Sequence, residues 1–138
     1  MSVWQQLQTK PAALVGAEGE LVSVSVSVDA HFLEEALEVL ANVRFPVNPE
    51  IYHEAALVDV YPDGRREVHP TTLVEFPAYS GRVAEVRQAL ERAGFPADSV
   101  HVSSMLDELD SHAHVETTPM GASYRDRIRV KHAHAAAA

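Results

Sequence analysis

The chain has 138 residues, of which 46 % are hydrophobic and 22 % charged, as is typical of one globular domain. It contains no cysteine, which excludes disulfides, thiolate metal sites and cysteine nucleophiles. A net charge of −9 argues against binding to nucleic acid or anionic lipid, and no stretch approaches the ~20 apolar residues of a membrane span, so we expect a cytoplasmic protein with no membrane partner.

The first regular pattern follows an N-terminal stretch, residues 1–20, that we expect to be an irregular arm because glycines interrupt it. Residues 21–28 read LVSVSVSV, and the alternation of valine with serine predicts a strand with one apolar face. Asp29 is a suitable helix N-cap, and apolar residues then recur every three to four positions. We therefore predict an amphipathic helix at about 30–43.

Three more strands and a second helix are predicted further along the chain. Prolines end the first helix, and strands follow at 51–61 and 66–77, joined by a turn at 62–64. The apolar spacing of SGRVAEVRQALERAGF predicts the second helix within residues 80–95. A fourth strand is expected at 99–105.

The element order is β-α-β-β-α-β, and a weak internal repeat supports it. Moving the chain by 50 positions places Leu40 on Leu90 and the Phe-Pro pair at 45–46 on the pair at 95–96. Two such units interleave into an α+β, ferredoxin-like βαββαβ sandwich, with a four-stranded antiparallel sheet and both helices on one face. We assign this domain to 21–106, and a C-terminal extension to 107–138.

The second helical segment also resembles a known family. SGRVAEVRQALERAGF, residues 80–95, resembles the glycine-then-helix segment of ACT domains, which are ferredoxin-like modules that bind amino acids and pair through their sheets or helices. The first half departs from that pattern, because Asp29-Ala30-His31 has no glycine at the matching turn. The resemblance therefore implies the fold and pairing but does not carry over a ligand site.

The C-terminal extension resumes an alternating pattern at its end. Over residues 124–134, apolar residues and histidines share one face, while Arg127, Arg129 and Lys131 share the other. This pattern predicts an added edge strand. Together with Arg125, these basic residues are the chain's one candidate patch for nucleic acid, which the overall negative charge makes an unfavoured partner.

The sheet face away from the helices is the first place to look for a site. Alternation places polar side chains there, and a histidine beside a carboxylate could act as a base or a metal ligand. The expected strand order 4-1-3-2 separates His53 from His101 by about 14 Å, so these two cannot share a metal. The candidates on this face are Ser23, Ser25, Ser27, His53, Asp59, Glu75 and His101.

Two other groups of residues are candidates for a binding or metal site. Asn48, Tyr52 and His53 surround a proline-rich turn, and loops on a rigid scaffold often hold binding residues. The eight histidines include two HxH pairs, His112/His114 and His132/His134, and on a strand both members of such a pair project to one side, as two imidazoles on one metal require. An exposed polar tail explains the same spacing.

No motif fixes a reaction, so function is inferred by elimination. We favour a non-enzymatic ligand-binding or regulatory module that forms a homodimer, takes a small-molecule ligand and needs no cofactor. The alternative is a divalent-metal-binding protein or small enzyme that uses the histidines and carboxylates of the uncovered sheet face or the tail. A dimer would pair two uncovered faces or edge strands, because exposed strand edges favour such contacts.

Overall fold

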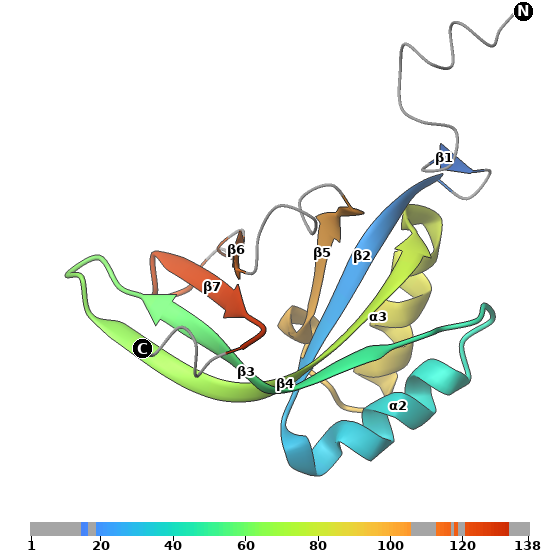
Figure 1. The fold of residues 1–138 in the computed structure, drawn as a ribbon, viewed down its shortest axis with the longest axis horizontal. Coiled ribbons are helices and arrows are strands. Elements are labelled where there is room, and N and C mark those ends of the chain that lie inside the picture. Colours follow the sequence, from blue (N-terminus) through green and yellow to red (C-terminus); the bar gives the residue numbers. More distant parts are fainter. Residues whose placement is uncertain (1–14, 17–18, 106–112, 117, 119–120, 133–138) are drawn as a thin grey trace, which may run out of the picture.

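The structure is a computed structural model and describes residues 15–16, 19–105, 113–116, 118 and 121–132. Figure 1 shows two helices against one part of a long, curved sheet. The helices are α2 (Leu33–Ala41) and α3 (Val83–Arg92), and each follows a 3-10 turn, η2 (Ala30–Phe32) or η3 (Ser80–Arg82). The strands are β1 (Val15–Gly16), β2 (Gly19–Val28), β3 (Glu50–Val60), β4 (Arg66–Tyr79), β5 (Val100–Ser104, after the 3-10 turn η4, Ala97–Ser99), β6 (Ala113–Glu116) and β7 (Asp126–Val130).

All pairings in the sheet are antiparallel, in the order β1-β2-β4-β3-β7-β6, with β5 paired to β2. Five strands, β5-β2-β4-β3-β7, form a half-barrel. The α+β class is confirmed, but the prediction of a four-stranded ferredoxin-like sandwich is wrong. The reason is that β3, expected at an edge, pairs on its second side with β7, and β7 pairs in turn with β6.

The predicted C-terminal edge strand also has a different place. The stretch 124–134 contains β7, which has β3 on one side and β6 on the other. It therefore lies within the sheet and not at its edge. The domain boundaries proposed at 21–106 and 107–138 stay predictions.

An apolar core lies between the helices and one face of the sheet. The valines of β2 point into it, and register places Val24 opposite Phe76 and Val26 opposite Val74. Leu40 of α2 and Leu90 of α3 are buried against them. Each such fully buried side chain stabilises the fold by roughly 1.5–3 kcal/mol. Among the described helices, none is both long and apolar enough to cross a bilayer.

The opposite face of the sheet, here called the inner face, carries the serines of β2. Register places Ser25 between Glu75 of β4 and His101 of β5, as the alternation predicts. On the other side of β4, Glu50 of β3 is the register partner of Glu75. Polar side chains therefore form a row across four strands.

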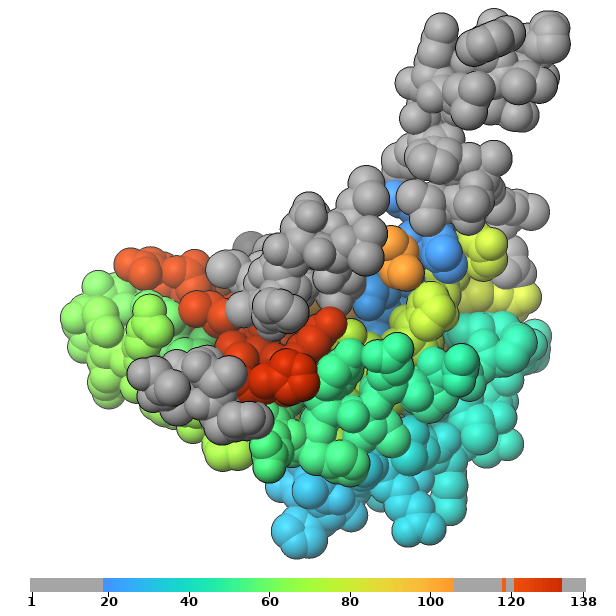
Figure 2. Space-filling view, in the orientation of Figure 1, coloured from blue at the N-terminus to red at the C-terminus, as the bar shows by residue number. Residues whose placement is uncertain are grey.

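A register shift in β3 accompanies the curvature of the sheet. The pairing of β3 with β4 slips between Tyr52 and Ala55, and such a bulge bends a strand and increases its twist. Beyond the bulge, the β3–β4 hairpin extends away from the helices and carries β7 with it (Figure 1). In the space-filling view, the red atoms of β7 lie directly beside the green atoms of β3 (Figure 2).

Arg129 of β7 and Lys131, which follows this strand, reach across the inner face because of this curvature. Arg129 Nη1 donates a hydrogen bond to Ser25 Oγ at 2.9 Å, and Lys131 Nζ lies 3.0 Å from Glu75 Oε1. Ser25 is 2 % exposed and Glu75 8 %. The expectation that this face is uncovered is therefore wrong, because alternation identifies a polar face but does not show what folds over it.

Candidate functional site

A cavity opens onto the inner face where β2, β3, β4 and the end of β7 meet. It has a volume of about 300 Å³, which is at the small end of the range for ligand pockets. We call it the Tyr52 cavity. Its polar lining consists of Ser23, Asn48, Glu50, Tyr52, Glu75 and Lys131.

The charged centre of the Tyr52 cavity is an ion pair beside an aromatic ring. Lys131 Nζ lies 3.0 Å from Glu75 Oε1 and 5.3 Å from the centroid of the Tyr52 ring. Only 15 % of the lysine side chain and 10 % of the glutamate side chain are exposed. Water therefore screens the pair less than it screens a surface ion pair. This ammonium is held by both a carboxylate and the face of a ring.

Tyr52 has a second role at the cavity mouth. Its hydroxyl donates a hydrogen bond to Glu50 Oε2 at 2.8 Å. Burial raises the pKa of Tyr52, and the hydrogen bond to the Glu50 carboxylate raises this pKa further. The phenol therefore stays protonated and acts as a donor at neutral pH. His132, at the end of β7, packs edge-on against the same ring at 5.7 Å between centroids.

A second charged cluster lies at the far end of the half-barrel. Arg127 holds Asp59 with two hydrogen bonds, Nε to Oδ1 at 2.6 Å and Nη2 to Oδ2 at 3.0 Å. The hydrogen bond from Arg127 lowers the pKa of Asp59 despite burial, and the nearby His69, 3.1 Å away, contributes in the same direction. This bidentate geometry is that of a structural clamp.

An apolar hollow of about 510 Å³ adjoins this cluster, between η2, the end of α3 and β3. Phe32, Leu57 and Phe95 line it, and Arg127 reaches its edge. Its polar lining among the described residues consists of Ser27, Asp29, Glu35, Asp98 and Ser99, in addition to Arg127. We rank it below the Tyr52 cavity, because Asp59 already holds Arg127 through two nitrogens, whereas the Tyr52 cavity has a mostly buried ion pair on its wall.

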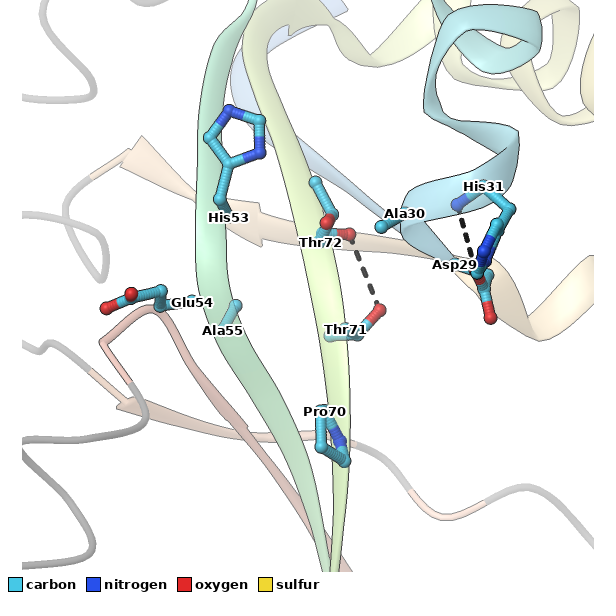
Figure 3. Close-up of a pocket in the computed structure, with 9 residues that line it drawn as sticks. All are labelled: Asp29, Ala30, His31, His53, Glu54, Ala55, Pro70, Thr71 and Thr72. Atoms are coloured by element: carbon cyan, nitrogen blue, oxygen red, sulfur yellow. Dashed lines mark hydrogen bonds and ion pairs between the residues drawn. The ribbon is translucent and has the colours of Figure 1, made fainter.

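A third hollow, of about 500 Å³, lies where η2 approaches β3 and β4 (Figure 3). His53 and Glu54 come from the bulge of β3, and Asp29 and His31 come from the turn before α2. Asp29 accepts hydrogen bonds from the backbone and the ring of His31, at 2.9 and 2.8 Å, and the backbone bond is the larger cause of its lowered pKa. All four of these residues are exposed, so they form a cap and a bulge at the surface and not an enclosed site.

The structure brings together three of the six predicted ligand-binding residues. Asn48, Tyr52 and Glu75 line the Tyr52 cavity. Asp59 lies in the Arg127 cluster, and His53 lines the third hollow. His101, on β5, is separated from β3 by β2 and β4, as expected.

The predicted metal ligands are only partly described. His112 and His134 lie outside the described residues, as does the side chain of His114. His132 is exposed and contacts Tyr52. Within the described part of the chain, no group of three or more His, Cys, Asp or Glu side chains is placed to hold a metal ion. The HxH metal site stays a prediction.

The sequence interpretation missed the basic residues that complete the site. Arg127, Arg129 and Lys131 were considered as a nucleic-acid patch, yet they contact Asp59, Ser25 and Glu75 respectively. The alternation of three basic residues indicates a basic face, but no local pattern shows which strand this face meets.

No protein-family model, curated protein or solved structure matches the chain.

Proposed function

We propose that this chain is a non-enzymatic binding or regulatory module whose small-molecule ligand occupies the Tyr52 cavity. The carrying observation is the ion pair of Lys131 and Glu75, which lies mostly buried on the cavity wall beside an aromatic ring. Removing charges from water costs free energy, and apolar side chains of similar volume often stabilise a fold as well or better. A role in ligand binding accounts for the presence of two charged groups, Lys131 and Glu75, at the wall of this cavity.

The lining of the cavity fits ligand binding better than a reaction. It combines donors, acceptors and a ring with the apolar side chains of Pro77 and Met105, which is the usual composition of a recognition site. Tyr52 is held as a proton donor by burial and by Glu50. The Lys131 ammonium lies 3.0 Å from the Glu75 carboxylate, so it is held in an ion pair on the cavity wall.

A thermal-shift screen of metabolites tests this proposal, because a ligand that binds only the folded state raises its apparent stability. Asn48→Trp is the blocking variant, since Asn48 is exposed at the cavity and a bulky ring there would close it. Asn42→Trp, at the exposed end of α2, is the matched control. We expect hits that raise the Tm of the wild type and of Asn42→Trp but not of Asn48→Trp. A screen without hits, or hits unaffected by Asn48→Trp, would contradict the proposal.

Self-association belongs to the same proposal, but with a changed contact surface. Pairing through the serine face is disfavoured, because Ser23 and Ser25 are buried within the monomer. Contact through an edge strand of the sheet is the form of self-association that we propose instead. Sedimentation at micromolar concentrations tests it: a mass that stays at 15.1 kDa as concentration rises would contradict self-association.

A further inference from the structure

We infer that the Tyr52 cavity takes a small organic cation, specifically a primary alkylammonium group, and that the Glu50 carboxylate binds it. This inference rests on the proposed function, because it names the ligand class of the same cavity. It follows from the balance of charge at the site, from a contact that the protein makes with its own lysine, and from the apolar part of the lining.

Among the described residues that line the cavity, two carry a carboxylate, Glu50 and Glu75, and one carries an ammonium, Lys131. Lys131 is paired with Glu75, whereas Glu50 accepts a hydrogen bond from the neutral Tyr52 hydroxyl. Because the Tyr52 pKa is raised, the phenol adds no charge. A cation is the ligand that brings the site to neutrality, and the net charge of −9 on the whole chain attracts cations to it.

Lys131 shows how such a cation would be held. Its side chain is an alkylammonium group, and it occupies a position between a carboxylate oxygen at 3.0 Å and a ring centroid at 5.3 Å. Rings and carboxylates together are a recurrent way of recognising ammonium groups. Glu50 supplies a second carboxylate to the cavity, and its Oε2 accepts the hydrogen bond from the Tyr52 hydroxyl at 2.8 Å.

The remaining lining suits a short hydrocarbon chain. Pro77 and Met105 supply apolar surface, and Met is a flexible side chain that adapts to different shapes. A cavity of about 300 Å³ admits a small ligand and excludes a large one. An alkyl chain of a few carbons fits this volume with its ammonium at the Glu50 end.

Calorimetric titration of the full chain with n-butylamine hydrochloride, butan-1-ol and sodium butyrate, at equal ionic strength, tests the ligand class. We expect the amine to bind and the alcohol and the carboxylate not to bind. Glu50→Gln should weaken amine binding by about fivefold, the scale of one partly exposed ion pair. Glu54→Gln, an exposed carboxylate on the same strand that lines a different hollow, should leave binding unchanged.

The outcomes separate the ligand class from the proposed function. Binding of butyrate or butanol in preference to the amine, blocked by Asn48→Trp, would overturn the cation and leave the cavity as a binding site. Amine binding that Asn48→Trp does not affect would overturn both. If none of the three probes binds, the cation is overturned, and the wider thermal-shift screen decides the proposed function.

Discussion

Asp59 is a buried carboxylate that is stabilised by a basic partner. Its side chain is 4 % exposed, and Arg127 meets both carboxylate oxygens. A carboxylate buried to this degree is stable only with a partner, because the unpaired charge would lose its hydration without compensation. The cluster therefore fixes β7 against β3 at the level of one residue pair.

Arg127→Met should lower the free energy of unfolding by about 3 kcal/mol at pH 7, because it leaves Asp59 buried without its main partner. Arg125→Met is the control, since Arg125 pairs with Asp126 at the surface and exposed pairs contribute less than about 1 kcal/mol. Urea denaturation measures both. Equal losses in the two variants would show that the Asp59 pair is not buried.

The pair of Asp59 and Arg127 also predicts how the free energy of unfolding changes in acid. The folded pKa of Asp59 is lowered by Arg127, so Asp59 contributes stability above its unfolded pKa of about 3.9 that is lost as pH falls through the folded value. When unfolding is followed from pH 5 to pH 2, we expect the free energy of unfolding to fall less steeply in Arg127→Met than in the wild type. A steeper loss in the variant would reverse the sign of the effect and contradict the pairing.

At the scale of elements, turns and strands depend on a few backbone positions. Gly19 begins β2 with a φ of +103°, and a Cβ there would collide with the Ser80 hydroxyl. That hydroxyl accepts a hydrogen bond from the backbone N–H of Glu20 at 3.1 Å. The start of β2 is therefore packed directly against the turn that precedes α3.

Gly19→Ala should cost about 2 kcal/mol, and Gly64→Ala about 1 kcal/mol. Both have positive φ, but Gly64 has no neighbouring atom within 4 Å of the added Cβ, so its variant isolates the backbone cost. Chemical denaturation gives the difference. Adding Ser80→Ala to Gly19→Ala should recover part of the extra loss, and no recovery would show that the two residues are not in contact.

Periodicity in the sequence predicted most elements but not their curvature. The valines of β2 and the apolar stripes of α2 and α3 follow simple periods, and each reaches the core as expected. Gly94 has a φ of +97° just beyond α3, a conformation that favours glycine at the C-terminal end of a helix. The bulge after Tyr52 leaves no such pattern, because an extra residue in a strand of mixed composition is invisible to a two-residue period.

The site was predicted only in part for a related reason. Asn48, Tyr52 and Glu75 could be selected by type and position, because a rigid turn and an alternating strand place them. Lys131 could not, since its contact with Glu75 joins the end of the chain to β4 through the curvature of the whole sheet. Contacts across a curved sheet depend on register and bend together, and neither is local to the sequence.

At the scale of the whole molecule, one curved sheet serves two purposes. Its helix-covered face holds the apolar core, and its inner face holds paired charges and the Tyr52 cavity. On the inner face, Arg127 and Arg129 of β7 and Lys131, which follows β7, contact Asp59, Ser25 and Glu75 on three different strands. Both the half-barrel and the Tyr52 cavity therefore require β7 to lie beside β3, with the residue that follows it at the cavity wall.

A double-mutant cycle between Lys131 and Glu75 tests that position most directly. The single variants Lys131→Met and Glu75→Gln and the double variant are compared with the wild type by urea denaturation. As a control, the same cycle on Arg82 and Glu85, a pair along α3 with 3.5 Å between its charged atoms, should give about 0.3–0.5 kcal/mol. A Lys131–Glu75 coupling of about 1 kcal/mol or more is the predicted result, and a coupling near zero would show that β7 does not fold across the inner face.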